Sequence, residues 1–274
     1  KDELIKALRV IDKNIQDEIK IFPYAEIGEL SYGIVNLPVM QIRDNPKHSA
    51  QLITQAIMGT TLRVIGKSSK KADWIQICMD EDKYVGWAKK VDISFVNKSS
   101  YEKYKSENKI LITDLAVNLL KEEDKTSKLD EKVFMTSRIV LIEENKDFYK
   151  VRMPIGNKHY SDKEFFIPKA SARFIGKDLV QNKEVTTELV VKAKSLISSP
   201  YLWGGTSPAM MDCSGLTQML YKSNGYSIPR DADQQQEFTK PVKSRDDLQT
   251  GDLVFFADSG KSATHVGMYI GDKK

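Results

Sequence analysis

The sequence predicts an α+β protein in which two small β-barrels precede a domain that combines helices with a sheet. Three observations lead to this fold class. From about position 34, short runs alternate apolar and polar residues as β-strands do, and the same succession of runs returns about 75 residues later. After Gly176 the apolar residues take up helical spacing instead. With 274 residues, the chain is long enough for several domains of about 100 residues each.

Residues 1–30 form a segment of their own, with the pattern of an amphipathic helix that Pro23 should end. Its apolar side chains recur at steps of three and four, at Leu4, Leu8, Ile11, Ile15 and Ile19. We expect this stripe to pack on the protein itself, and binding to a partner is the alternative.

Residues 31–96 are expected to form the first barrel. The β-type runs cover 34–37, 61–65, 74–77 and 84–87, with turn-forming residues between them. Several cues resemble those of bacterial SH3-like domains: Arg43 with Pro46, Gly59, Trp74 at the start of a strand, and Gly86-Trp87. We expect both tryptophans to lie in the barrel core.

Residues 110–176 repeat this pattern and predict a second barrel. The runs 117–120, 138–142, 148–151 and 165–168 match runs of the first barrel, although this copy keeps few of the SH3-like cues. Between the copies, residues 97–109 are polar and rich in Lys and Ser, which predicts a linker.

Composition excludes several classes of protein. Forty-two basic and 38 acidic side chains are interspersed and give a net charge of +4, too little for a nucleic-acid-binding surface. The chain has no run of about 18 apolar residues, so no membrane span is predicted, and no signal peptide is visible. Cys78 and Cys213 cannot build a disulfide framework. His48, His159 and His265 lack the spacing of zinc ligands, and we expect no cofactor.

Cys213 has the surroundings of a nucleophile. It stands between Asp212 and Ser214, and apolar residues at 216, 219 and 220 indicate that a helix begins at or just after it. The free N–H groups of a helix start favour a thiolate over a thiol. A buried cysteine without chemistry is the alternative.

His265 lies on a predicted strand. Positions 263–271 alternate strictly, and residues 251–256 supply a partner strand across a turn at 258–260. A cysteine followed later in the chain by a histidine is an order that cysteine peptidases use. A structural histidine is the alternative.

Five motifs follow one another between residues 199 and 274. They are Pro-Tyr-x-Trp-Gly-Gly (200–205), Asp-Cys-Ser-Gly (212–215), Pro-Arg-Asp (229–231), Gly-Asp-Leu-Val-Phe-Phe (251–256) and His-Val-Gly-Met-Tyr-Ile-Gly (265–271). Together they resemble the NlpC-type cysteine peptidases, which have a papain-like α+β fold and cut bacterial cell-wall peptides. The resemblance implies that 177–274 is the catalytic domain, with Cys213 as nucleophile, His265 as general base and Tyr201 helping to hold the oxyanion. The family's third catalytic residue would follow Lys274, where we expect the sequence to be cropped.

With SH3-like modules ahead of this domain, the chain is similar to the γ-D-glutamyl-L-diamino acid endopeptidases, also called dipeptidyl-peptidase VI. That resemblance implies cleavage after γ-D-Glu in stem peptides that begin with a free L-Ala. Asp212 would bind the substrate ammonium, with Ser214 beside it. Trp203 would wall the cleft, and Tyr84 would reach it from the first barrel. A carboxylate that caps the helix is the alternative for Asp212.

Other interpretations stay open. Arg230 and Asp231 could form a structural ion pair near the site. The chain could be a peptidoglycan-binding module that no longer cuts, or an amidase or D,L-endopeptidase of intact wall, which Tyr84 far from Cys213 would favour. We expect a monomer that acts on stem peptides in the cell envelope or after secretion, with a cytoplasmic recycling role as the alternative.

Overall fold

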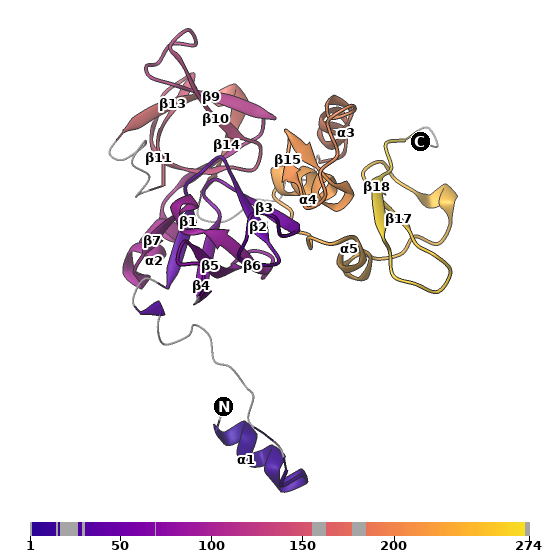
Figure 1. The fold of residues 1–274 in the computed structure, drawn as a ribbon. Coiled ribbons are helices and arrows are strands. Elements are labelled where there is room, and N and C mark those ends of the chain that lie inside the picture. The colour runs from indigo at the N-terminus through magenta and orange to yellow at the C-terminus, as the bar shows by residue number, and fades with distance from the viewer. Residues whose placement is uncertain are drawn as a thin grey trace.

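The computed structural model describes residues 2–14, 16, 27–28, 31–68, 70–154, 163–176 and 185–271. Helix α1 (Asp2–Ile11) lies apart from the other elements (Figure 1). In this helix Ile5 is buried, whereas Leu4 and Ile11 are 54% and 83% exposed, so the expected packing of the stripe is wrong for these two residues. The remaining residues of that prediction, Ile15, Ile19 and Pro23, lie outside the described residues.

Two seven-stranded antiparallel sheets follow, and they have the same strand order. The first, in the order β3-β2-β6-β5-β4-β1-β7, contains β1 (Tyr32–Val35), β2 (Val39–Arg43), β3 (Leu52–Ile57), β4 (Thr61–Lys67), β5 (Trp74–Met79), β6 (Val85–Lys89) and β7 (Ile93–Val96). The second, in the order β10-β9-β13-β12-β11-β8-β14, contains β8 (Lys109–Ile112), β9 (Ala116–Leu120), β10 (Lys128–Phe134), β11 (Arg138–Glu144), β12 (Phe148–Arg152), β13 (Glu164–Pro168) and β14 (Ala172–Gly176). Each strand of one sheet therefore has a counterpart in the other, as the repeat in the sequence predicts.

Strand β3 is an addition to the predicted runs of the first sheet. Its polar side chains Thr54 and Gln55 are buried, being 0% and 8% exposed, because both are hydrogen-bonded to the C-terminal domain. Alternation of apolar and polar residues reveals a strand only when one of its faces meets solvent. Because the contact between domains buries the polar side chains of β3, the sequence pattern does not predict this strand.

The two predicted core tryptophans lie outside the apolar cluster of the first sheet. Trp74 is buried, but its ring is 5.5 Å from that of His48 and 4.8 Å from the Lys89 ammonium. Trp87 is half-buried. Trp74 is therefore buried as expected, but by polar neighbours and not in the apolar core. Trp87 is not in the core.

The segment 97–109 is a packed helix rather than a loose linker. Helix α2 (Lys98–Ser106) begins at Asn97, whose side chain accepts a hydrogen bond from the Ser100 amide at 2.9 Å. Tyr101 and Tyr104 bury their rings between the sheets, at 1% and 2% exposure. Composition suggested a linker because the remaining residues of this helix are polar and face solvent.

The C-terminal part combines helices with short strands, as the α+β prediction requires. Its elements are α3 (Val185–Ser195), β15 (Thr206–Ser207), β16 (Met210–Met211), α4 (Cys213–Ser223), α5 (Ala232–Phe238), β17 (Leu253–Phe256) and β18 (His265–Met268). Helix α4 packs against α3, α5, β15 and β18 and therefore lies at the centre of these elements (Figure 1). Short 3-10 helices occur at Lys90–Asp92, Lys169–Ser171 and Arg245–Asp247. No helix among the described residues is both long and apolar enough to cross a membrane.

The turn between β3 and β4 fastens the first sheet to the second. Gly59 in this turn has a left-handed backbone with φ +86°, and a Cβ atom there would overlap the Arg138 carbonyl. The Arg138 amide donates to the Met58 carbonyl at 3.1 Å, and the Tyr104 hydroxyl lies 3.3 Å from the Arg138 carbonyl oxygen. Only glycine permits this close approach.

We therefore expect Gly59→Ala to destabilise the protein more than Gly260→Ala does. Gly260 has a similar φ of +72°, but no atom lies within 4 Å of the place that a Cβ would take, so it isolates the backbone strain, about 1–2 kcal/mol. Gly59→Ala should lose a further 1–3 kcal/mol or so through overpacking. Urea unfolding of both variants measures the difference, and equal losses would contradict the close approach.

Candidate active site

Cys213 is the first residue of α4, as the sequence predicts. Asp212 is the N-cap, with an extended backbone, and its Oδ1 accepts a hydrogen bond from the Gly215 amide at 2.7 Å. Cys213 is half-buried and packs against Ala232, Ala263 and Val266. The backbone N–H groups that begin α4 therefore place the positive end of the helix dipole beside this thiol.

The Tyr201 side chain contacts Cys213. Tyr201 forms an isolated bridge with Met211 in the strand that leads into α4, and its side chain is 61% exposed. Partial burial, the neighbouring Cys213 and Asp212 charges and a hydrogen bond with Cys213 raise the pKa of the Tyr201 phenol. The structure therefore brings these two predicted site residues together.

His265 begins strand β18, which pairs with β17 as the sequence predicts. It lies opposite Phe256, with the ring centroids 5.7 Å apart, and is exposed. The next residue, Val266, belongs to the buried cluster against which Cys213 packs. The structure thus places His265 on the strand beside α4. Direct contact between the side chains of His265 and Cys213 stays a prediction.

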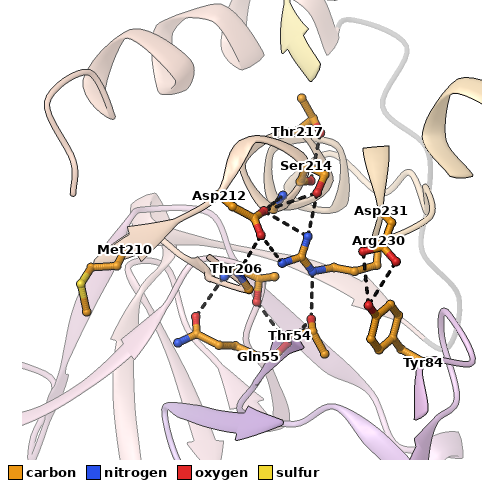
Figure 2. Close-up of polar contacts among 12 residues, drawn as sticks. Thr54, Gln55, Tyr84, Thr206, Met210, Asp212, Ser214, Thr217, Arg230 and Asp231 are labelled. Atoms are coloured by element: carbon orange, nitrogen blue, oxygen red, sulfur yellow. Dashed lines mark hydrogen bonds and ion pairs between the residues drawn. The ribbon is translucent and has the colours of Figure 1, made fainter. Parts of the chain in front are cut away.

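The Asp212 carboxylate forms a buried ion pair with Arg230. The guanidinium donates from Nη2 to Oδ2 at 2.7 Å and from Nη1 to Oδ1 at 3.1 Å, a two-point contact (Figure 2). Oδ2 also accepts from the Gly204 amide at 2.8 Å. With the Gly215 amide on Oδ1, the carboxylate uses its four principal acceptor positions within the protein. The helix-capping alternative for Asp212 is therefore the one that the geometry favours.

Arg230 is 1% exposed and links helix α4 to the first sheet. Its Nη1 donates to the Ser214 hydroxyl at 2.8 Å, and its Nε donates to the Thr54 hydroxyl at 2.9 Å. The alternative of an ion pair between Arg230 and Asp231 does not hold, because the Arg230 guanidinium pairs with Asp212. The Ser214 hydroxyl, expected near the substrate, is 5% exposed and occupied by this network.

Tyr84 reaches the C-terminal domain from the first sheet, and its place in a substrate cleft stays a prediction. Its hydroxyl is 3.1 Å and 3.3 Å from the two carboxylate oxygens of Asp231 (Figure 2). Burial raises the pKa of Asp231, and burial together with the Asp231 charge raises the pKa of Tyr84. Asp231, which the sequence marks only through Pro-Arg-Asp, is thus a half-buried carboxylate with a phenol as its hydrogen-bond donor.

Trp203 is carried by a loop that is docked on the first sheet. The Trp203 side chain is 61% exposed. The following Gly204 has φ +79°, and a Cβ there would come within 2.6 Å of the Leu52 carbonyl oxygen. The Thr206 amide donates to the Gln55 side chain at 2.9 Å. The loop is therefore fixed on β3 while its indole remains accessible.

Gln235, which the sequence does not mark, joins α5 to α4. Its side-chain oxygen accepts from the Thr217 hydroxyl at 2.8 Å, and its Nε2 donates to the Ser214 carbonyl at 3.1 Å. A buried glutamine in a short polar helix gives no local signal of this role. In the described part of the chain no group of His, Cys, Asp and Glu side chains could hold a metal, and His159 lies outside it.

Two family models match parts of the chain. The NlpC/P60 family model matches residues 198–274, and the model for the bacterial dipeptidyl-peptidase Sh3 domain matches residues 42–93. The first match includes Cys213 and His265, and the second includes Tyr84.

The chain is similar to two proteins named gamma-D-glutamyl-L-lysine dipeptidyl-peptidase. The one from Bacillus cereus (strain ATCC 10987 / NRS 248) is 31% identical over 81% of this chain and 66% of its own length. The one from Bacillus subtilis (strain 168) is 30% identical over 81% of this chain and 70% of its own length. The chain thus spans about two-thirds of these relatives. The crystal structure of an NlpC/P60 family protein from Bacillus cereus ATCC 10987 has the same fold, with a TM-score of 0.73 at 24% identity over 88% of both chains.

The buried ion pair leads to a prediction about stability. Arg230→Met should cost about 3–5 kcal/mol, because it leaves the Asp212 carboxylate buried and uncompensated. Adding Asp212→Asn removes that charge and keeps a capping oxygen, so the double variant should lose less than the sum of the two single variants. Urea unfolding measures this double-mutant cycle.

The exposed pair Lys261 and Asp258, 3.2 Å apart with side chains 70% and 80% exposed, provides the control. Lys261→Met and Asp258→Asn should add within about 0.5 kcal/mol. If the losses of stability at Arg230 and Asp212 were also additive, the two buried side chains would not stabilise each other, which would contradict the prediction.

Proposed function

The chain belongs to the NlpC/P60 family, and we propose that it is a cysteine peptidase of peptidoglycan stem peptides. We propose further that it hydrolyses the bond between γ-D-Glu and an L-diamino acid when the peptide begins with a free L-Ala. The observation that carries this proposal is the contact of Tyr84 with Asp231, which brings a residue of the first sheet to the domain that carries Cys213. The names of the two dipeptidyl-peptidase relatives support it.

In the proposed reaction Cys213 is the nucleophile and His265 the general base. The sulfur attacks the carbonyl carbon of the scissile bond while His265 takes the thiol proton. The C–N bond then breaks as His265 returns this proton to the leaving amino group, which leaves an acyl-enzyme. A water molecule that gives a proton to His265 then attacks the acyl carbon. The C–S bond breaks as His265 passes this proton to the sulfur, which releases the free acid and restores the thiol. The Tyr201 hydroxyl, which contacts Cys213, would donate to the oxyanion.

We propose Asp231, rather than Asp212, as the carboxylate that binds the substrate ammonium. Asp212 is already neutralised by Arg230 and accepts two backbone hydrogen bonds. Asp231 accepts only from the neutral Tyr84 hydroxyl among the hydrogen bonds described for its side chain. An ammonium group would satisfy the half-buried carboxylate and relieve the cost of its burial. A blocked or polymer-linked N-terminus would lack that charge.

We also propose that residues 110–176 form a second SH3-like domain. The identical strand order of the two sheets supports this assignment. The second sheet contacts the first through Gly59 and Arg138. In this arrangement the first domain shapes the cleft and the second supports the first.

The proposed reaction is tested with L-Ala-γ-D-Glu-L-Lys and its diaminopimelate analogue, each with a free and an N-acetylated N-terminus. The full chain should release L-Ala-γ-D-Glu from the free peptides only, and Cys213→Ala should abolish release. Mass spectrometry identifies the products, and Cys78→Ala is the matched control for loss of a thiol. Release by Cys213→Ala would contradict the nucleophile, and cleavage of acetylated peptide would contradict amine recognition.

Loss of the Asp231 charge should weaken binding of the free peptide specifically. Asp231→Asn is expected to raise KM about 10- to 100-fold, because a hydrogen-bonded ion contact is worth about 1.5–3 kcal/mol, with kcat changed much less. Asp233→Asn makes the same charge change at an exposed position two residues along, in the first turn of α5, and should leave KM unchanged. Steady-state kinetics measures both constants. An unchanged KM in Asp231→Asn would contradict the proposal that Asp231 binds the substrate ammonium.

A further inference from the structure

One carboxylate, that of Glu81, joins three parts of the protein. Glu81 lies in the turn between β5 and β6 of the first sheet. Its Oε1 accepts from Arg138 Nη2 at 3.2 Å, at the start of β11 in the second sheet. Its Oε2 is 3.4 Å from Lys222 Nζ, in the last turn of α4. Each oxygen thus serves a different neighbour, and neither contact is local in sequence.

The three side chains form a largely buried cluster. Glu81 and Lys222 are each 16% exposed, and Arg138 is 22% exposed. Burial alone would raise the pKa of Glu81, but the charges of Lys222 and Arg138 lower it to about 2. The carboxylate is therefore ionised throughout the pH range in which a cysteine peptidase works. Charges that are this well shielded from water interact strongly, and removing one leaves the others uncompensated.

The turn that carries Glu81 also carries Tyr84, and hydrogen bonds close it. Lys83 has a left-handed backbone with φ +60°. The Tyr84 amide donates to the Asp82 side chain at 3.1 Å, and the Tyr84 carbonyl accepts from the Met79 amide at 3.0 Å. Because the turn is closed by these bonds, the position of Glu81 determines where Tyr84 can lie.

The Lys222 contact connects this turn to the helix of the nucleophile. Cys213 and Lys222 are the first and tenth residues of α4, about 14 Å apart along one rigid helix. Glu81 therefore holds the turn on the same element that presents the thiol. At the other end of the turn, Tyr84 meets Asp231.

We propose that Glu81 is a positioning residue for amine recognition, which fixes the turn 80–84 on α4 and so holds the Tyr84 hydroxyl at Asp231. This inference rests on the proposed function, in which Asp231, with Tyr84 as its hydrogen-bond donor, binds the substrate ammonium. Glu81 acts through Tyr84 and not on the substrate. The second sheet takes part, because Arg138 holds the other oxygen of the same carboxylate.

The test uses the full chain with Glu81→Gln and, as an independent variant, Lys222→Met. The control is Glu188→Gln, which removes the same charge from a Glu–Lys pair within α3. Hydrogen exchange measures the protection of the backbone amides in the turn. Steady-state kinetics with L-Ala-γ-D-Glu-L-Lys measures the effect on KM and kcat. Both variants should exchange faster at residues 80–86 and raise KM at least fivefold, with kcat within twofold of the parent value. The control should change neither.

A double-mutant comparison tests the route of the effect. On a Tyr84→Phe background, Glu81→Gln should raise KM no further, because the group that it positions has been removed. Unchanged exchange at 80–86 in the variants, or effects on KM that multiply fully, would overturn the positioning role. Faster exchange with a normal KM in Tyr84→Phe would keep the positioning role and refute amine recognition by Tyr84. Lys222→Met decides the matter if Glu81→Gln fails to fold.

Discussion

The start of helix α4 depends on the ion pair between Arg230 and Asp212, and the rest of the site is arranged around it. A guanidinium that is 1% exposed costs much free energy to desolvate unless nearly every donor finds a partner. Here Asp212, Ser214 and Thr54 supply those partners. The same carboxylate caps the helix and receives the Gly204 amide. One network thus fixes the cysteine, the Trp203 loop and the first sheet relative to one another.

The ion pair also divides the acidic residues of the site into two kinds. Asp212 is neutralised inside the protein, whereas Asp231 has a neutral donor and a pKa raised by burial. The family resemblance implies Asp212 as the carboxylate for the substrate ammonium, whereas these contacts support our proposal that Asp231 has this role. Asp231 has an extended backbone, in which consecutive side chains point to opposite sides. Arg230 can therefore turn toward Asp212 while Asp231 turns toward Tyr84, a choice that depends on contacts distant in sequence.

Features governed by local periodicity were predictable from the sequence. The helix start at Cys213, the pairing of β17 with β18 and the repeat of the sheets all follow from spacing that neighbouring residues reveal. Features created by contacts between domains were not. Helix α2 looks like a linker because only Tyr101 and Tyr104 are buried, and the polar pair of β3 is buried by a domain 150 residues or so further along the chain.

Strand β3 ends the first sheet, and its counterpart β10 ends the second, so the repeat presents the same edge twice. The β3 edge has no charged residue and is covered by the C-terminal domain. The β10 edge carries Lys128, Asp130, Glu131 and Lys132, all of them exposed. Charges on an uncovered edge discourage pairing with other chains. The two sheets therefore differ at this edge, and a first sheet separated from the C-terminal domain would present an unprotected strand for self-association.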